Sequence, residues 1–329
     1  MRPTLADIAA IARVSPATVD RVLHDRPGVS ARTRAMVLQA ARQLDYLPDR
    51  PEAPAPLSFH LILPQSANSY FRELIGHARA LTPPHVTLDI VRAPVLDPVA
   101  FARVLHGLGP SDGIAVLALG HPAVSEAVRA RVEGGTPVVT LATDIPDAPR
   151  TGFVGLDNIR AGRLAGYTLA RFLGPSPRGR VALIAGHLGF RGHVEREMGF
   201  REVLAQDFPG LTLLELRESR EDRARARSET RALLTAHPDL AGIYNAGGGT
   251  VGIGAALAEA GRRDIAFVAH EATGENRALL LDGTLDAVID QSARDQMQEV
   301  FAILTAATRG QAHVSPPLRP VLIVRENLP

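Results

Sequence analysis

The sequence predicts a small all-α headpiece followed by an α/β body built from two parallel-sheet subdomains. Two observations carry this prediction. Helix-capping residues and helical apolar spacing fill the segment from Thr4 to Tyr46, whereas apolar strand-like runs alternate with amphipathic segments from Leu57 onward. The 329 residues are enough for two or three domains. We therefore divide the chain into a headpiece at 1–48, a linker at 49–56 and a body at 57–329.

The headpiece is predicted to contain three short helices. Thr4 can cap the first helix, in which apolar residues recur at helical spacing: Leu5, Ile8, Ala9 and Ala12. Ser15 can cap the second helix, Pro16–Leu23, where proline is favourable because a first-turn N–H would be unpaired anyway. Ser30 can cap the third helix, whose apolar face is Val37, Ala40, Ala41 and Leu44. Three short helices with a tight link between the first two follow the helix-turn-helix plan.

The second helix is the expected DNA-reading element, because the N-terminal part of this helix enters the major groove in helix-turn-helix proteins. Arg21 can make a bidentate contact with guanine, worth about 1–3 kcal/mol of discrimination, and Ala17 can contact a thymine methyl group. Hydroxyl groups near the caps can bond phosphates, which position the protein without reading sequence. The competing interpretation is a three-helix bundle that binds protein. The predicted DNA-binding residues are Thr4, Ser15, Pro16, Ala17, Thr18, Asp20, Arg21, Ser30 and Thr33.

Several short runs in the headpiece carry a family resemblance: Leu5-Ala6-Asp7-Ile8-Ala9, Val14-Ser15, Ala17-Thr18-Val19, Arg21-Val22-Leu23, Val29-Ser30, Thr33-Arg34 and Leu44-Asp45-Tyr46-Leu47-Pro48. With these runs the segment closely resembles the DNA-binding headpiece of the LacI/GalR family of bacterial transcription regulators. The resemblance implies a ligand-controlled regulator of transcription, and we expect a repressor. Two-fold symmetry would pair two chains as a homodimer on a pseudo-palindromic operator.

Two headpiece residues depart from the family pattern. Asp20 stands where the family usually has a Ser near a phosphate, and a carboxylate there would repel the DNA backbone. Arg13 stands where Gly or Asn is common, at a turn that is expected to need positive φ. An ordinary residue in that conformation costs roughly 1–2 kcal/mol.

The linker is rich in proline, with Pro48, Pro51, Pro54 and Pro56 in close succession. Proline at this density disfavours a helix and favours extended polyproline conformation. Many family members have a short hinge helix here that wedges a Leu into the minor groove, and this linker has no such Leu. We therefore expect an extended spacer without minor-groove kinking, and a plain flexible linker remains the favoured interpretation.

The body shows near-continuous apolar strands that alternate with helices, a pattern typical of parallel sheets covered on both faces. This length suits two α/β subdomains with a cleft between them, and ligands bind at the carboxyl ends of such strands. The predicted strands are Phe59–Leu63, Val86–Val91, Gly113–Leu119, Val138–Leu141, Phe153–Leu156, Val181–Ala185, Leu211–Leu216, Gly242–Tyr244, Ile265–Ala269, Ala287–Ile289 and Val321–Val324.

The body also resembles the sugar-binding, type I periplasmic-binding-protein fold that LacI/GalR regulators share with ribose-type binding proteins. The resemblance implies a first subdomain at 57–158 and a second at 159–290, with a C-terminal crossover at 291–329 that completes the first. It also implies a small-molecule effector, namely a sugar, sugar acid or polyol, in the cleft between the subdomains.

Candidate effector-binding residues fall at strand ends, where that fold places them. Relatives use aromatic residues to stack on a sugar ring, an acid to accept sugar hydroxyls, and an Asn, an Asp and a Gln from three further strands. At the position where relatives have this Asp, the chain has Glu271, whose side chain is longer. We therefore expect a different or smaller ligand than ribose. Phe71 could instead be a core residue, and Arg196 could be structural. The candidates are Asn68, Tyr70, Phe71, Asp144, Arg191, His193, Arg196, Asn245, Glu271 and Gln291.

Composition narrows the class of protein. The net charge is +1, but the first fifty residues carry eight Arg, five Asp and no Glu, so the basic excess is local to the headpiece. No Cys is present, which excludes disulfides and thiol catalysis. No signal-peptide core or membrane-length apolar run is found, so we expect a cytoplasmic protein without a membrane partner.

Two alternatives remain open at this point. Gly247–Gly252 fits GxGxxG after an apolar strand, with Glu271 after the next strand, as in NAD(P)-linked oxidoreductases. No catalytic constellation accompanies it, so we expect no cofactor and no enzyme. A solute-binding protein without a DNA role is the other alternative. His187 and His193 have no further ligand at zinc-site spacing, so no metal site is expected.

Overall fold

The computed structural model describes residues 3–24, 26–46, 55–94, 96–316 and 318–328. The chain separates into two compact units, Met1–Ala55 and Pro56–Pro329, and each unit has its own hydrophobic core. Of the helices in the described ranges, none is both long and apolar enough to cross a membrane.

The headpiece unit contains the three predicted helices, α1 (Leu5–Ala12), α2 (Pro16–Leu23) and α3 (Ala31–Gln43). Each begins at its predicted cap, because the side chains of Thr4, Ser15 and Ser30 accept hydrogen bonds from the first-turn backbone. The small core joins all three helices and consists of Ile8, Ala9, Ala12, Val19, Val22, Val37, Ala40 and Ala41. The predicted helix-turn-helix plan is confirmed.

Arg13 occupies the turn that links α1 to α2. Its φ of 54° and ψ of 43° are left-handed, as the turn was expected to require. This conformation costs an ordinary residue roughly 1–2 kcal/mol, which the packing of α1 against α2 must offset. The prediction of an extended spacer at 49–56 falls mostly on residues 47–54, which lie outside the described residues, and it stays a prediction.

The first sheet of the body unit is entirely parallel, with strand order β2-β1-β3-β4-β5. Its strands are β1 (Leu57–Gln65), β2 (Val86–Pro94), β3 (Gly113–Val116), β4 (Val138–Leu141) and β5 (Gly152–Val154). Its helices are α4 (Ser69–Leu81), α5 (Pro98–Gly107), α6 (Pro122–Glu133) and, from the far end of the chain, α12 (Ala293–Thr308).

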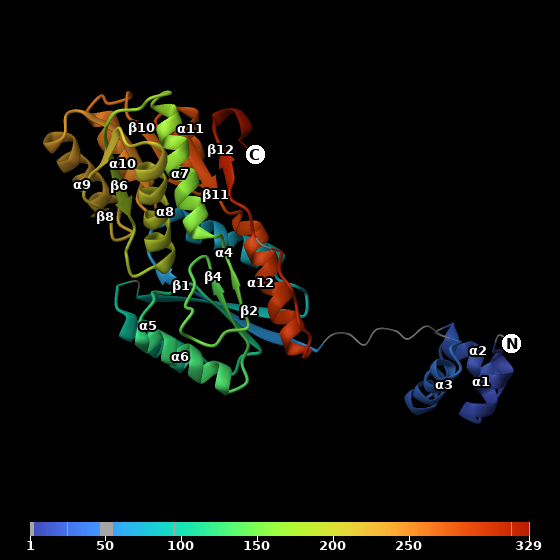
Figure 1. Ribbon diagram of the computed structural model, residues 1–329. Coiled ribbons are helices and arrows are strands. Elements are labelled where there is room, and N and C mark those ends of the chain that lie inside the picture. Colours follow the sequence, from blue (N-terminus) through green and yellow to red (C-terminus); the bar gives the residue numbers. More distant parts are fainter. Residues whose placement is uncertain (1–2, 25, 47–54, 95, 317, 329) are drawn as a thin grey trace. The chain divides into compact units, whose positions relative to one another are not determined.

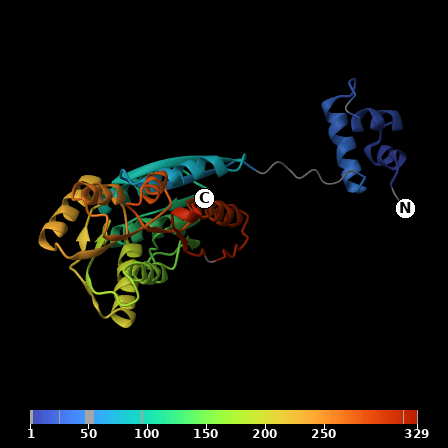
Figure 2. The same ribbon diagram turned by 90° about the horizontal axis from the view of Figure 1, so that it is seen from above.

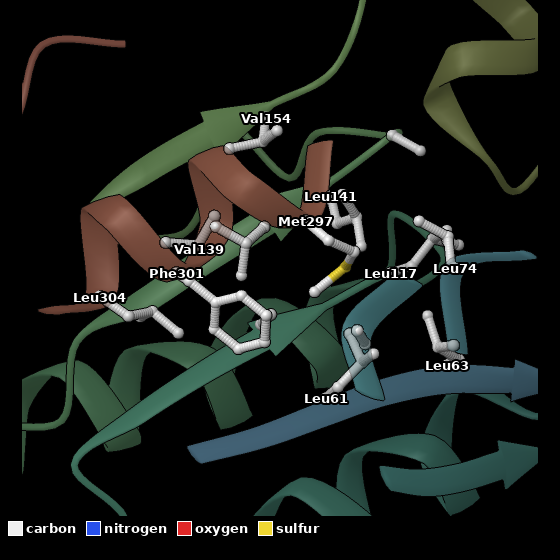
Figure 3. Close-up of a cluster of buried hydrophobic side chains, with 14 of the residues drawn as sticks. Leu61, Leu63, Leu74, Leu117, Val139, Leu141, Val154, Met297, Phe301 and Leu304 are labelled. Carbon is white, nitrogen blue, oxygen red and sulfur yellow. The ribbon is translucent and has the colours of Figure 1, made fainter. Parts of the chain in front are cut away.

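Side chains of this sheet enter two cores, one on each face. Figure 3 shows the face under α12, where Met297, Phe301 and Leu304 point toward strand residues that include Leu61 and Val139. The opposite core lies under α5 and α6 and takes the alternate strand residues. Burial on both faces explains why these strands are near-continuous apolar runs.

The second sheet has strand order β12-β11-β10-β9-β6-β7, with β8 paired beside β6. Its strands are β6 (Gly179–Ala185), β7 (Leu211–Leu213), β8 (Arg217–Glu218), β9 (Leu240–Asn245), β10 (Ala266–His270), β11 (Ala287–Asp290) and β12 (Val321–Ile323). Its helices are α7 (Asn158–Phe172), α8 (Arg191–Asp207), α9 (Arg223–Ala236), α10 (Thr250–Glu259) and α11 (Gly274–Leu281). The two-residue strand β8 was not predicted.

The C-terminal segment serves both subdomains, which differs from the predicted crossover at 291–329. Helix α12 packs on the first sheet, but β12 returns to the second sheet and pairs antiparallel with β11, and the turn η1 (Arg325–Asn327) follows it. Figure 1 shows β12 beside β11, and Figure 2 shows the red C-terminal helix near the strands of the first subdomain. The reason is that Leu322 and Ile323 pack against the cores of the second sheet.

Candidate functional site

The predicted DNA-reading surface begins at the N-terminus of α2. The Thr18 N–H donates to Ser15 Oγ at 3.2 Å, and the two hydroxyls lie 2.9 Å apart. The same arrangement recurs at the start of α3 with Ser30 and Thr33. Thr4 and Asp7 form a reciprocal capping box on α1. The predicted reading residues Pro16, Ala17 and Arg21 are exposed.

Asp20, which the sequence predicts to repel the DNA backbone, has two basic partners in the structure. Its Oδ2 lies 3.2 Å from the Arg26 guanidinium, and its Oδ1 lies 2.9 Å from His24 Nδ1. The Arg26 charge partly compensates the carboxylate, so its repulsion of a nearby phosphate is weaker than that of an isolated acid.

A second candidate site is a pocket in the body, between the carboxyl ends of the two sheets. It encloses about 800 Å³ of space, part of which is open to solvent, and both subdomains line it. The structure brings together most of the predicted effector residues in its wall: Asn68, Tyr70, Phe71, His193, Arg196, Glu271 and Gln291.

Three predicted effector residues do not line this pocket. Asp144 accepts hydrogen bonds from Thr140 Oγ1 at 2.7 Å and Arg150 Nη2 at 2.6 Å, and it lies on a separate outer groove. Arg191 lies on the same groove and pairs with Glu195 at 2.6 Å. Asn245 is fully buried below the glycine-rich turn.

The Asn245 amide organises that turn rather than facing the pocket. Its Nδ2 donates to the Gly247 carbonyl at 2.9 Å and to Thr250 Oγ1 at 3.0 Å. The residue therefore holds the pocket wall in place from behind.

Arg196 places a buried positive charge in the pocket wall. Its Nε donates to Asn158 Oδ1 at 2.8 Å, and its Nη1 donates to the Ala246 carbonyl at 3.0 Å. Both of these partners are neutral oxygens, so the charge is compensated only by carboxyl groups farther away in the pocket. Arg196 thus combines the structural role that the sequence left open with a position in the pocket lining.

A chain of buried hydrogen bonds connects the two subdomains behind the pocket. The Tyr70 hydroxyl donates to Gln296 Oε1, Gln296 Nε2 donates to Gln291 Oε1 at 2.7 Å, and Gln291 Nε2 donates to Glu271 Oε1 at 2.6 Å. These bonds fix the orientation of both Gln amide groups. Tyr70 on α4 and Gln296 on α12 thus help to orient the Glu271 carboxyl group through Gln291.

Glu271 and His193 are uncharged at neutral pH. Burial, followed by the nearby Asp290 carboxylate, raises the pKa of Glu271 to about 8, so its carboxyl group can donate as well as accept a hydrogen bond. Burial, followed by the Arg196 charge, lowers the pKa of His193 to about 3. Such groups suit hydroxyl groups of a ligand, which also donate and accept.

Aromatic rings supply the apolar part of the wall. Phe71 belongs to the core of the first subdomain and also lines the pocket, so the two interpretations of this residue are compatible. Phe190 also lines the pocket and contacts the His193 ring edge-on, with ring centroids 5.3 Å apart.

The sequence reading missed Glu221, which lines the pocket just before α9. Its Oε2 accepts from Asn68 Nδ2 at 2.7 Å, and its Oε1 accepts from the Gly248 N–H at 3.3 Å. Arg220 and Glu221 both have positive φ, 52° and 59°. The available signal was an acidic residue between a strand and the helix cap Asp222, which is too common to identify a site.

The glycine-rich turn Gly247–Gly252 is occupied by the protein's own groups. A Cβ at Gly248 would lie 2.4 Å from Glu221 Oε2, and one at Gly252 would lie 2.1 Å from the Arg223 carbonyl oxygen. A carboxylate at the turn is unfavourable for a dinucleotide pyrophosphate, and the glycines serve close internal packing. Across the described ranges, no group of three or more His, Cys, Asp or Glu side chains could hold a metal ion.

Comparison with known proteins finds relatives for the headpiece and for the body. The family model for bacterial regulatory proteins of the lacI family matches residues 4–49, and that for a periplasmic binding protein domain matches residues 107–312. The chain is 29% identical over 171 residues to the ribose import binding protein RbsB of Escherichia coli (strain K12), covering 51% of this chain and 56% of RbsB. It is 29% identical over 220 residues to the transcriptional regulator CelR of Thermobifida fusca, covering 62% and 61%. The chain thus spans less than two thirds of each relative.

Solved structures share the fold of the body. A solute-binding protein from Burkholderia graminis, in complex with D-arabinose, superposes with a TM-score of 0.78 at 23% identity and covers 84% of this chain and 98% of its own. The glucose-galactose binding protein GanP from Geobacillus stearothermophilus gives 0.75 at 23% identity, covering 83% and 99%. With its helix-turn-helix headpiece and its two parallel-sheet subdomains, the chain belongs to the lacI family of bacterial regulatory proteins and has a periplasmic-binding-protein domain as its body.

Proposed function

We propose that the protein is a sequence-specific DNA-binding transcription regulator, and a repressor, whose operator binding is controlled by a sugar or sugar-like molecule. The observation that carries the proposal is the combination, in one chain, of an exposed reading face on α2 and a polar pocket between two subdomains. Neither feature alone requires the other. Together they make a protein that binds DNA and senses a small molecule.

The proposed DNA complex contains two chains on a pseudo-palindromic operator. Arg21 contacts a guanine edge and Ala17 a thymine methyl group, while the hydroxyl groups at the caps bond phosphates. A homodimer follows from operator symmetry, since each half-site takes one headpiece. The site of action is the cytoplasm, where operator DNA is accessible.

The proposed effector binds between the subdomains and holds them together. Asn68 and Tyr70 come from the first subdomain, whereas Arg196 and Glu271 come from the second, so one ligand can contact both. Closure around the ligand changes the arrangement of the headpieces on DNA. Moving operator occupancy substantially takes a differential affinity of a few kcal/mol between the two states.

The two alternatives are weaker on physical grounds. An oxidoreductase would need an anionic dinucleotide at a turn that already carries Glu221. A solute-binding protein has no need of a headpiece with a capped, exposed reading helix. We therefore propose a binding protein that catalyses no reaction.

The DNA-binding half of the proposal is tested with the Arg21→Ala variant. Operator fragments selected by the wild-type protein would be titrated and compared with fragments mutated at single positions. Because a bidentate Arg–guanine contact reads sequence, Arg21→Ala should lose discrimination at one base pair of each half-site by roughly tenfold or more. Its binding to unrelated DNA should change little.

Arg42→Ala is the matched control, since Arg42 is an exposed Arg in the last turn of α3 and is not a predicted DNA contact. An equal loss on all sequences for Arg21→Ala would show that this residue meets only phosphate. If the wild type selects no DNA sequence at all, the regulator proposal fails.

A further inference from the structure

Glu221 stands out among the pocket residues because it is a carboxylate held by both subdomains. The side chain is 5% exposed. Asn68, the cap of α4 in the first subdomain, donates to one oxygen, and the Gly248 backbone of the second subdomain donates to the other. Burial raises the pKa of the Glu221 carboxyl, and these two hydrogen bonds act in the opposite direction.

The two donors fit the ionised form of Glu221. A carboxylate accepts most strongly at both oxygens, and each Glu221 oxygen here accepts from one N–H group. The backbone supports the placement, because Ser219 Oγ donates to the Gly248 carbonyl at 3.0 Å and fixes the turn against the loop that carries Glu221. The Glu221 backbone is in a strained left-handed conformation at this position, with a φ of 59°.

The carboxylate occupies the place where an anionic ligand group would bind. The turn Gly247–Gly249 precedes α10, and the partial positive charge and free N–H groups of such a helix start attract anions. Here the Gly248 N–H is already bonded to Glu221. The space is also filled, since a Cβ at Gly186 would lie 1.6 Å from Glu221 Oε1. A phosphate or carboxylate of a ligand would meet a fixed negative charge at this wall.

The other charged side chains of the inner pocket do not make it favourable for an anionic ligand. At the mouth, Arg223 and Arg72 both pair with Glu275, so that group of three side chains keeps one positive charge outside the inner pocket. In the inner wall, Arg196 faces Glu221 and Glu271. Because Glu271 is protonated at neutral pH, the inner pocket is close to neutral without a ligand. A ligand anion would make it negative in a poorly solvated site, and a ligand ammonium would face the Arg196 guanidinium.

We propose that Glu221 is a specificity-determining residue that restricts the effector to uncharged polyhydroxy compounds, namely neutral sugars and polyols, and excludes sugar phosphates and sugar acids. The proposal rests on the proposed function and narrows its ligand class. It removes the sugar acids that the sequence alone allowed.

The test uses the full-length chain and measures thermal stability with matched compounds. Each neutral member, D-ribose, D-glucose, D-galactose and D-mannitol, is paired with its terminal phosphate, and each aldose also with its aldonate. At a concentration far above its dissociation constant, the effector should raise the Tm of the wild type by roughly several degrees. The phosphate and acid of the same compound should give no shift.

Two variants remove the charge in different ways. Glu221→Gln keeps the shape and the acceptor for Gly248, and Glu221→Gly relieves the left-handed conformation and opens the space. Both should bind the phosphorylated partner or inorganic phosphate at least tenfold more tightly than the wild type does. Glu202→Gln, which removes an exposed carboxylate from α8 outside the pocket, is the control and should behave as the wild type.

The outcomes separate this proposal from the proposed function. A sugar phosphate or sugar acid that stabilises the wild type as well as its neutral partner overturns the role of Glu221, while the regulator proposal stands. If no compound in the panel stabilises the wild type, the inorganic phosphate titration decides. Equal phosphate binding by the wild type and both variants then refutes the proposal, and binding by the variants alone supports it. Loss of DNA selectivity in the Arg21 experiment affects only the proposed function.

Discussion

Glu271 illustrates how much of the pocket chemistry is decided at single residues. Its backbone is left-handed, with a φ of 70°, and its side chain accepts from Gln291 at 2.6 Å. Burial and Asp290 raise the pKa of the carboxyl from 4.5 to about 8. The folded protein therefore holds a proton on Glu271 over a pH range in which the unfolded chain has released it.

This linkage predicts how Glu271→Gln changes the pH dependence of stability. The folded state binds the extra proton between about pH 4.5 and pH 8, so this group's contribution is present below that window and is lost as pH rises through it. Glu271→Gln should remove this loss of stability. At pH 8 and above, its free energy of unfolding should exceed that of the wild type by up to a few kcal/mol. Urea unfolding at several pH values measures this difference.

The variant must be compared with the wild type at each pH, because His193 makes stability depend on pH with the opposite sign. With a folded pKa of about 3, His193 lowers stability as pH falls below its ordinary value of 6.5. Parallel pH profiles for Glu271→Gln and the wild type would show that Glu271 is ionised in the folded protein, contrary to our prediction.

The packing of α7 against α8 shows how an element positions the site. A Cβ at Gly162 would lie 2.0 Å from the Arg196 carbonyl oxygen, and one at Gly199 would lie 2.0 Å from the Ile159 carbonyl oxygen. The two helices therefore touch through their backbones. This close approach brings Arg196 on α8 within hydrogen-bond distance of Asn158, the first residue of α7.

We predict that Gly199→Ala destabilises the body by about 1–3 kcal/mol or more, because backbone atoms must move to admit the methyl group. Gly76→Ala is the control, since a Cβ at this α4 position would meet nothing within 4 Å. That change should stabilise by roughly 0.5–1 kcal/mol, as alanine is the better helix former. Thermal unfolding of both variants checks the prediction, and similar Tm values for the two would contradict it.

At the scale of the whole body, the subdomains are linked across the mouth of the pocket. Arg72 on α4 lies 2.6 Å from Glu275 on α11, and Arg223 on α9 pairs with the same carboxylate. Ser69 Oγ donates to Thr273 Oγ1 at 3.0 Å nearby. These contacts join the two subdomains across the cleft.

Arg72→Ala should therefore weaken effector binding without changing any group that lines the pocket. The side chain is 55% exposed and the pair is screened by solvent, so we expect a loss of roughly fivefold at most, smaller at high salt. Arg79→Ala, an exposed Arg on the same helix, is the control. Calorimetric titration of both variants with the effector at two salt concentrations measures the loss. An affinity equal to that of the control would mean that the contact does not contribute to closure.

The sequence by itself determined the features that depend on neighbouring residues. Thr4, Ser15 and Ser30 define the starts of the headpiece helices because a cap satisfies backbone groups two or three residues away. The strands of the body were predictable because parallel strands buried on both faces need continuous apolar runs. The resemblance to a family then supplied the order of the domains.

The tertiary structure decided which side chains meet, because that depends on contacts between distant segments. Asn68 and Glu221 are 153 positions apart in the chain, yet they share a hydrogen bond. Asp144 sits at a strand end like the pocket residues, but its bond to Arg150 holds it on the outer groove. Strand β12 joins the second sheet because its apolar side chains find a core there, which no local pattern specifies.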